Sequence, residues 1–191
     1  NDYKGIVAIK STVECGFTQS AIDEFNNLTL CFVPEFLRER CAMDDFISNH
    51  NLLAVGTHDK FVFDKIVEAH GHYPKATARL KPTEAEILKY YNNVFAAYKI
   101  IFANIMSEVC GKLNCDYTTV KDAFVKFGRC KDTYLDVNEN LKGYGGMCLP
   151  KDVKAMTKLL EKLDIDFDTF KSIDTDNSKL KTTVFNGMRK Q

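Results

Sequence analysis

The chain has 191 residues, of which 45% are hydrophobic, so it can bury a real core in one domain or in two small ones. Its 26 basic and 26 acidic residues cancel, which excludes the strong net charge typical of proteins that bind nucleic acid or anionic membranes. The seven cysteines form no metal-ligand spacing, and no stretch has the pattern of a signal peptide or a membrane span, so we expect a cytoplasmic protein.

Residues 1–80 alternate between strand-like and helix-like segments. Helices are predicted at residues 20–25, briefly from Pro34 and at residues 60–70, and strands at GIVAIK, LTLCFV, LLAVG and ATARL. This alternation is typical of βαβ units and predicts the second half of a Rossmann-like nucleotide-binding sheet. Glycine and proline between residues 70 and 82 mark the end of this first domain.

Two polar segments follow predicted strands. Ser11 and Thr12 come directly after the first strand, and ligands bind beyond the carboxyl ends of strands in open α/β sheets, so Thr12 is expected near a bound cofactor. After the second strand, Pro34 can start a helical turn that puts Glu35 and Glu39 on one side. Mutual repulsion and burial would then raise the pKa of at least one carboxyl, although a plain surface helix is an equal alternative.

His70 and His72 flank a glycine and resemble half of a metal site. No nearby cysteine or acidic cluster completes four ligands. We therefore predict a polar turn here and no metal site.

From Glu84 to Leu113 the sequence has no proline and only Gly111 as a glycine, which predicts a helix of roughly 45 Å. Its apolar residues form two adjacent stripes, Ile87, Tyr91, Val94, Tyr98, Ile101, Ile105 and Val109, and Leu88, Phe95, Phe102 and Met106. Such a helix needs cover on several sides, from a partner subunit or from a monomer's core. The pattern stays helical beyond it, so residues 81–191 are predicted to be an all-α domain.

Lys89 and Asn93 are four residues apart and therefore share one face of this helix. On an ordinary helix they would be a solvated polar pair. An ammonium and an amide can also stabilise a developing oxyanion together.

Cys148 lies in GYGGMCLPKD, between a glycine-rich turn and an expected helix start. Pro150 suits the first turn of a helix, and a thiol just before that turn faces unpaired N–H groups and the positive end of the helix dipole. These surroundings favour the thiolate and predict a nucleophile, with Lys151 and Asp152 nearby. The alternative is a buried structural cysteine.

The same decapeptide resembles the active-site cysteine signature of the UDP-glucose and GDP-mannose 6-dehydrogenase family of nucleotide-sugar dehydrogenases. Three more segments resemble the family in the same order, IKSTVECGFT, FVPEFLRER and EAEILKYYNN. The resemblance implies NAD-dependent oxidation of a sugar alcohol to an acid, through a thiohemiacetal and a thioester on the cysteine. It favours UDP-glucose, with GDP-mannose as the alternative substrate. A non-catalytic helical dimerisation module derived from the family is a further alternative.

The resemblance also implies roles for individual residues. Catalysis would use Cys148 as the nucleophile, together with Lys89, Asn93, Asp152, Glu35 and Thr12. Substrate binding would use Phe36, Leu37, Glu39, Lys89, Asn93, Tyr144 and Gly145. Arg129 would reach into the sugar-nucleotide site of the partner subunit, with an ordinary surface arginine as an equal alternative. Cofactor binding would use Ser11, Thr12, Glu39 and Lys151.

The resemblance further implies a homodimer through the helix from Glu84 to Leu113, and no nucleic-acid or membrane partner. No strand-GxGxxG-helix fingerprint for a dinucleotide is present. We therefore expect a partial chain, without the family's N-terminal half of the cofactor sheet and its C-terminal nucleotide-binding domain. It would be either a piece of a larger protein or a shortened relative whose missing parts are supplied by another chain or lost.

Overall fold

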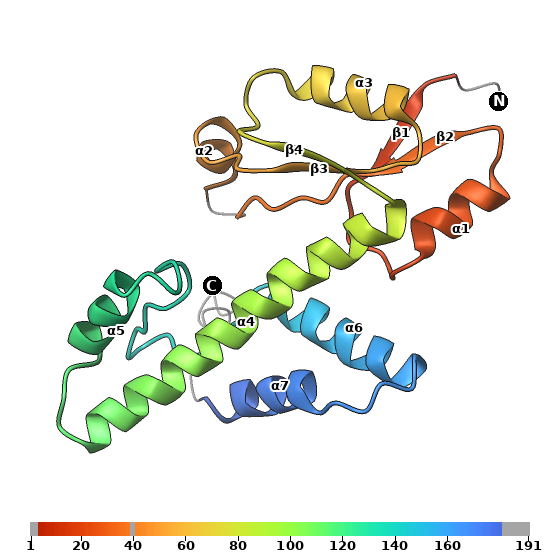
Figure 1. Cartoon of the computed structure of the whole chain (residues 1–191). Coiled ribbons are helices and arrows are strands. Elements are labelled where there is room, and N and C mark those ends of the chain that lie inside the picture. Colours follow the sequence, from red (N-terminus) through yellow and green to blue (C-terminus); the bar gives the residue numbers. More distant parts are fainter. Residues whose placement is uncertain (1–3, 39–40, 181–191) are drawn as a thin grey trace, which may run out of the picture. The chain divides into compact units, whose positions relative to one another are not determined.

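A computed structural model describes residues 4–38 and 41–180 of the chain (Figure 1). The chain divides into two compact units, Asn1–Tyr91 and Asn92–Gln191. The first is an α/β unit and the second is helical, which confirms the predicted fold class.

The first unit contains a four-stranded sheet in the order β1-β2-β3-β4. Its strands all lie within predicted strand segments and are Ile6–Ile9, Thr29–Phe32, Leu53–Gly56 and Thr77–Leu80. β1 pairs with β2 and β3 with β4 in parallel, whereas β2 and β3 are antiparallel and paired through Phe32 and Gly56. The sheet is therefore mixed and not a uniform series of βαβ units.

Three helices accompany the sheet: α1 (Phe17–Glu24), α2 (Ala42–Ile47) and α3 (Lys60–His70). α3 has the predicted bounds, and the Asp59 carboxylate caps it by accepting from the Phe61 N–H. Figure 1 shows α3 on one side of the sheet. Its Val62 belongs there to a buried core with Cys31, Val33, Leu53 and Val55.

The helix predicted from Pro34 is wrong, because residues 33–38 are not helical. The Glu35 carboxylate accepts the backbone N–H groups of Phe36 and Leu37, and such local bonds compete with helical ones. The buried Asp45 carboxylate binds both the backbone N–H and the guanidinium of Arg38. These bonds fix an irregular segment, and helix α2 begins only at Ala42.

The long predicted helix is α4 (Pro82–Lys112), with 31 residues. Its first turns belong to the first unit, and it continues in the second from Asn92. By length and composition alone it could cross a membrane, with a mean hydropathy of 1.3 in a window that is 39% buried, which corrects our expectation of no such stretch. However, its buried Glu86 and Asn93 bond to other parts of their own units, as expected of a core helix.

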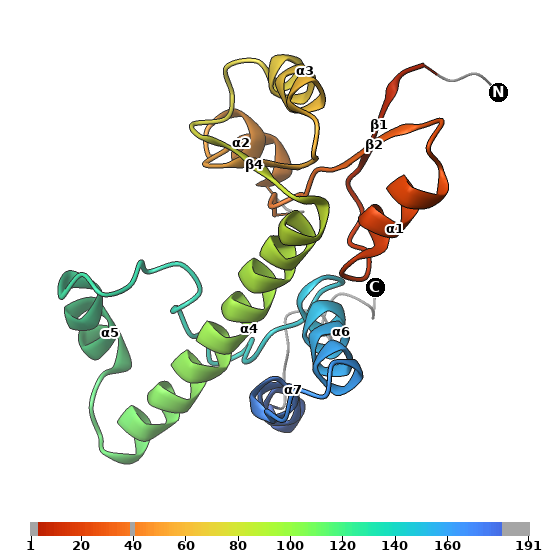
Figure 2. The same cartoon turned by 45° about the vertical axis from the view of Figure 1, so that its right-hand side comes forward.

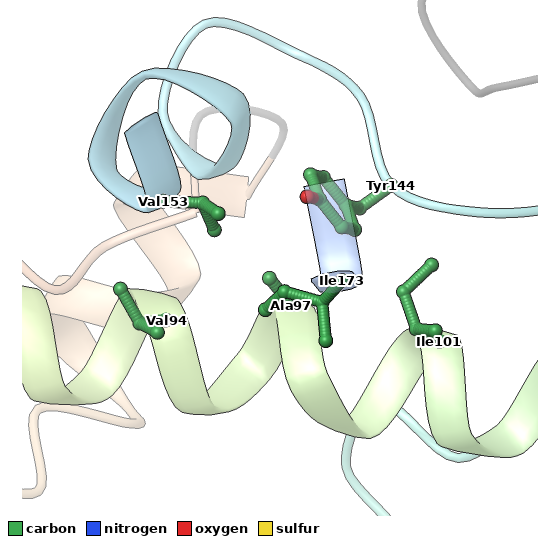
Figure 3. Packing of buried hydrophobic residues seen from close by; sticks show 6 residues of the cluster. All are labelled: Val94, Ala97, Ile101, Tyr144, Val153 and Ile173. Carbon is green, nitrogen blue, oxygen red and sulfur yellow. The ribbon is translucent and has the colours of Figure 1, made fainter. Parts of the chain in front are cut away.

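The second unit continues with α5 (Tyr117–Lys126), α6 (Leu149–Lys162) and α7 (Thr169–Lys179). Figures 1 and 2 show α6 and α7 beside the middle turns of α4. Their shared core, drawn in Figure 3, consists of Val94, Ala97, Ile101, Tyr144, Val153 and Ile173. Residues 127–148 are irregular, so the prediction of helix throughout this unit is wrong there.

The apolar side chains of α4 divide between a buried and an exposed face. Val94 and Ile101 are buried, whereas the exposed stripe consists of Ile87, Tyr91, Phe95, Tyr98, Phe102, Ile105 and Val109. The members of this stripe recur at spacings of three and four, so they lie along one side of the helix. The first predicted stripe is therefore split between core and surface, whereas the second has the exposed Phe95 and Phe102 and the half-buried Leu88 and Met106.

Candidate active site

The predicted site residues fall into two groups, one in each unit. In the first unit, β1 and β2 run parallel, so the segments after them leave the same edge of the sheet. The Val33 N–H donates to the Ile9 carbonyl at 2.8 Å, which holds these segments together. Lys10 consequently lies beside Glu35, with 3.1 Å between Nζ and Oε2. Ser11 and Thr12 follow at this edge, Ser11 exposed and Thr12 half-buried.

Glu35 is held as a carboxylate. Burial raises its pKa, but the hydrogen bond and charge of Lys10 and the N–H groups of Leu37 and Phe36 lower it, and the net shift is downward. The raised pKa that we expected for at least one carboxyl of the pair is therefore not found at Glu35. Glu39, the other member, lies outside the described residues. Glu35 is therefore ionised at neutral pH and can accept a proton.

Lys89 reaches the same segment from α4. Its ammonium donates to the Glu35 carbonyl oxygen at 2.5 Å and lies 5.6 Å from the centroid of the Phe36 ring. Phe36 and Leu37 are half-buried. Lys89, Glu35 and Phe36 thus form one cluster of predicted substrate and catalytic residues.

Two residues of α4 that the sequence analysis missed anchor the segment after Thr12. The fully buried Glu86 carboxylate accepts the Gly16 N–H at 2.6 Å and the Thr18 N–H at 2.8 Å, at the start of α1. The Tyr90 hydroxyl donates to the Val13 carbonyl at 2.9 Å. Glu86 and Tyr90 are four residues apart on the helix, a spacing that could have indicated a shared face.

In the second unit, Cys148 directly precedes α6 at its N-cap position, as predicted. Pro150 lies in the first turn, and the Asp152 N–H donates to the Cys148 carbonyl at 3.0 Å. The Cys148 side chain is exposed. It is therefore open to a reactant at the positive end of the helix dipole.

The fully buried Asp152 lies in the first turn of α6. The Asn93 amide donates to Asp152 Oδ2 at 2.6 Å, and the Lys151 ammonium lies 2.7 Å from Oδ1. The Asn92 amide donates to Asn93 Oδ1 at 2.9 Å, which orients the Asn93 NH₂ group toward the carboxylate. Asn93, Lys151 and Asp152 therefore form a bonded group that fixes the helix turn following Cys148.

The glycine-rich turn before Cys148 has left-handed backbone at two of its glycines, with φ of 79° at Gly143 and 78° at Gly146. Glycine is the residue that adopts such φ values most readily. Gly145, a predicted substrate contact, is half-buried. The turn is therefore built on residues that tolerate left-handed backbone.

Tyr144, a predicted substrate contact, is held within the second unit. Its ring is buried in the core of the unit (Figure 3), and its hydroxyl is 3.4 Å from Asp174 Oδ1. Burial, and then the charge of Asp174, raise the pKa of this phenol. The ring is an anchor for the turn and not an open binding group.

Asn177 of α7 completes this anchor and was also missed. Its Oδ1 accepts the Tyr144 N–H at 2.8 Å, and its Nδ2 donates to the Tyr144 carbonyl at 3.0 Å. A Cβ on Gly143 would lie 2.4 Å from the same Oδ1. Asn177 and Tyr144 are 33 residues apart in the sequence, so no local sequence pattern predicts their contact.

Arg129 is exposed in the segment after α5, with its guanidinium 5.3 Å from the centroid of the Phe127 ring. The buried Lys121 ammonium fixes this segment, 2.6 Å from Asp136 and 3.1 Å from Asp132. These hydrogen bonds and charges raise the pKa of Lys121. The predicted role of Arg129 in a partner subunit's site stays a prediction.

Within residues 4–38 and 41–180, no group of three or more His, Cys, Asp or Glu side chains could hold a metal ion. His70 Nδ1 lies 2.7 Å from the Ile66 carbonyl, and the His72 ring stacks on Tyr73. Both histidines thus have local partners.

Comparison with known proteins gives a consistent assignment. Residues 83–179 match the central domain of the UDP-glucose/GDP-mannose dehydrogenase family. The UDP-glucose 6-dehydrogenase YwqF of Bacillus subtilis is 30% identical over 88% of this chain, and the GDP-mannose 6-dehydrogenase of Pseudomonas aeruginosa is 31% identical over 76%. The matches cover 39% and 33% of those relatives.

A solved structure of a UDP-glucose dehydrogenase is also similar to this chain. The UDP-glucose dehydrogenase of Pyrobaculum islandicum superposes with a TM-score of 0.81 at 30% identity, over 91% of this chain and 41% of that one. The chain therefore spans about two fifths of the length of such relatives. With its central-domain match and its shared fold, the chain belongs to the UDP-glucose/GDP-mannose dehydrogenase family.

Proposed function

We propose that this chain carries the catalytic cysteine of an NAD-dependent dehydrogenase that oxidises UDP-glucose to UDP-glucuronate. The observation that supports this most is the exposed Cys148 at the start of α6, followed by the bonded group of Asp152, Asn93 and Lys151. A packing module has no need for an open thiol at the start of a helix whose first turn holds a buried carboxylate. Family membership supports the same reaction class.

In this proposal the primary alcohol of the sugar is first oxidised to an aldehyde. The Cys148 thiolate then attacks the aldehyde carbon, forming a C–S bond and a thiohemiacetal. A second oxidation gives a thioester. Water attacks its carbonyl carbon, the C–S bond breaks, and the acid leaves while the sulfur of Cys148 is restored.

Lys89 and Asn93 are proposed to stabilise the oxyanion that develops on the substrate. Asn93 uses one amide hydrogen on Asp152, and an NH₂ group carries two. Glu35, ionised at neutral pH, is proposed to accept a proton during the reaction. Asp152 and Thr12 are assigned to the water of thioester hydrolysis.

The cofactor would be NAD, which when bound supplies the hydride acceptor for both oxidations. Its fit rests on the carboxyl edge of β1 and β2, where Ser11 and Thr12 offer hydroxyl groups. Ser11, Thr12, Glu39 and Lys151 are proposed to hold it. Phe36, Leu37, Glu39, Arg129 and Gly145 are proposed to hold the nucleotide sugar.

A homodimer through α4 is part of the proposal. The exposed stripe of α4, from Ile87 to Val109, is apolar over most of the helix length, and apolar surface of this extent commonly marks an interface. The seven free cysteines suit the cytoplasm.

The test is NADH formation by the chain alone and by any longer parent protein, with UDP-glucose and with GDP-mannose. We expect faster turnover with UDP-glucose and loss of acid formation in Cys148→Ser, while Cys130→Ser serves as the matched cysteine control. NADH formation at an unchanged rate in Cys148→Ser would contradict the thioester mechanism. Faster turnover with GDP-mannose would instead assign the substrate of the Pseudomonas relative.

A further inference from the structure

The last turn of α4 ends in a backbone arrangement that brings two cysteines together. Asn114 adopts left-handed backbone with φ of 54°. The Cys115 N–H donates to the Cys110 carbonyl at 3.0 Å, and the Asn114 N–H donates to the Gly111 carbonyl at 3.3 Å. This pair of bonds is the Schellman motif, which is frequently accompanied by a side-chain contact between the positions that Cys110 and Cys115 occupy here.

The end of α6 provides an internal comparison. Asp164 has φ of 55°, the Ile165 N–H donates to the Leu160 carbonyl at 2.9 Å, and the Asp164 N–H donates to the Glu161 carbonyl at 3.2 Å. The two contacting positions there are Leu160 and Ile165, the apolar pair that usually accompanies this motif. At the end of α4 the same two positions carry thiols.

The two thiols differ in access. Cys110 is buried and Cys115 is exposed, and the Cys115 thiol donates to the Cys110 carbonyl at 3.5 Å. Burial first, and then the neighbouring Cys115 thiol, raise the pKa of Cys110. By contrast, the thiols of Cys41 and Cys130 bond to Asp45 and to the Lys131 carbonyl.

We propose that Cys110 and Cys115 form a redox modification site, in which a hydroperoxide converts the two thiols into a reversible intrachain disulfide. The exposed Cys115 sulfur attacks the peroxide, the O–O bond breaks, and Cys115 becomes a sulfenic acid while one oxygen leaves as water or an alcohol. The Cys110 sulfur then attacks the Cys115 sulfur, and the hydroxyl leaves as water with the remaining thiol proton. Two thiols are oxidised and one peroxide is reduced.

The bridge would act on the junction of α4 and α5. Asp116, which follows Cys115, caps α5 by accepting the Thr118 and Thr119 N–H groups at 3.2 and 2.9 Å. A covalent link from Cys110 to Cys115 would therefore tie the last turn of α4 to the first of α5. The site does not depend on the proposed dehydrogenase activity.

The test treats the full chain with hydrogen peroxide, alkylates the remaining thiols, and digests with trypsin. Lys112 lies between the two cysteines, so trypsin separates them into two peptides unless a disulfide joins them. We expect a linked pair that has lost two hydrogens and is split again by dithiothreitol. Cys115→Ser and Cys110→Ala should each abolish the linked peptide, and Cys148→Ser should leave it unchanged.

Two results would overturn the proposal. One is separate, alkylated Cys110 and Cys115 peptides at peroxide doses that already oxidise the exposed Cys148. The other is a linked peptide that joins Cys115 to a cysteine other than Cys110. Circular dichroism of each variant, matched to that of the parent chain, ensures that a missing link reflects a missing thiol and not an unfolded chain.

Discussion

Glu35 in the first unit and Asp152 in the second are both carboxylates among the predicted site residues, and their surroundings differ strongly. Glu35 is 39% exposed and pairs with Lys10, which is 47% exposed, whereas Asp152 is fully buried between Asn93 and Lys151. A buried charge that loses a partner is costly, while an exposed pair contributes little. Asp152 should therefore maintain the structure around Cys148, and Glu35 should be replaceable without loss of the fold.

The largest effect should come from Asp152→Ala. This change leaves the buried Asn93 amide without its acceptor and removes a charge-assisted bond to Lys151, so we expect the free energy of unfolding to fall by about 3 kcal/mol. Urea unfolding measures it. The matched control is Asp166→Ala, an exposed aspartate beyond α6, which should change stability by less than about 0.5 kcal/mol.

Glu86→Gln tests whether burial of a carboxylate determines how much stability is lost when it is replaced, whichever unit contains it. Glu86 is a fully buried carboxylate of the first unit, and its two oxygens accept from Gly16 and Thr18 at the start of α1. The glutamine keeps one acceptor but turns an NH₂ group toward the other N–H and loses the charge at the helix end. We expect a loss of about 2 kcal/mol in urea unfolding. Stability equal to that of the parent chain would show that burial is not the deciding factor.

The turn before Cys148 offers a matched pair of glycines. Gly143 and Gly146 have nearly equal φ, but only at Gly143 would a Cβ meet Asn177, whereas nothing lies within 4 Å of one at Gly146. Alanine at either position costs about 1 kcal/mol in left-handed backbone, and Gly143→Ala should cost about 1 kcal/mol more. The excess should shrink in an Asn177→Ser background. Equal losses in both single variants would exclude the Asn177 contact as a constraint on the turn.

The sequence predicted those elements whose signals are local. The bounds of α3 and the start of α6 follow from periodicity and from Pro150, and the strands follow from short β-rich runs. By contrast, the cap from Glu86 to α1 spans 68 to 70 residues, and the Asn177 contact spans 33. Such contacts depend on how elements pack, which a propensity does not contain.

The same distinction explains the errors at the candidate site. Pro34 suits a helical turn, but the Glu35 carboxylate satisfies the following N–H groups itself, and Asp45 binds Arg38. Tyr144 lies between glycines in the sequence, which predicts an exposed turn. Only the packing of α4, α6 and α7 shows that its ring completes a core. Residue types indicated which groups could react. The tertiary contacts show which side chains hold neighbouring segments in place.

The smallest effect should come from Lys10→Met, which removes the cation beside Glu35. Because the pKa of Glu35 is lower in the folded protein than in the unfolded chain, the pair stabilises the fold above the ordinary carboxyl pKa, and this contribution is lost as the pH falls through the folded pKa. Without Lys10, burial still raises the pKa of Glu35, so it should move upward in an NMR titration of the carboxyl carbon. The stability lost at neutral pH should stay below about 1 kcal/mol, since Lys10 and Glu35 are 47% and 39% exposed.

Lys60→Met is the control for Lys10→Met, because Lys60 pairs with Asp64 in an exposed pair of α3 and not with Glu35. It should leave the Glu35 titration unchanged. If Lys10→Met also left the pKa of Glu35 unchanged, the N–H groups of Phe36 and Leu37 would be its main determinant. Glu35 would then be kept ionised by backbone N–H groups after β2, whereas Asp152 accepts from the side chains of Asn93 and Lys151.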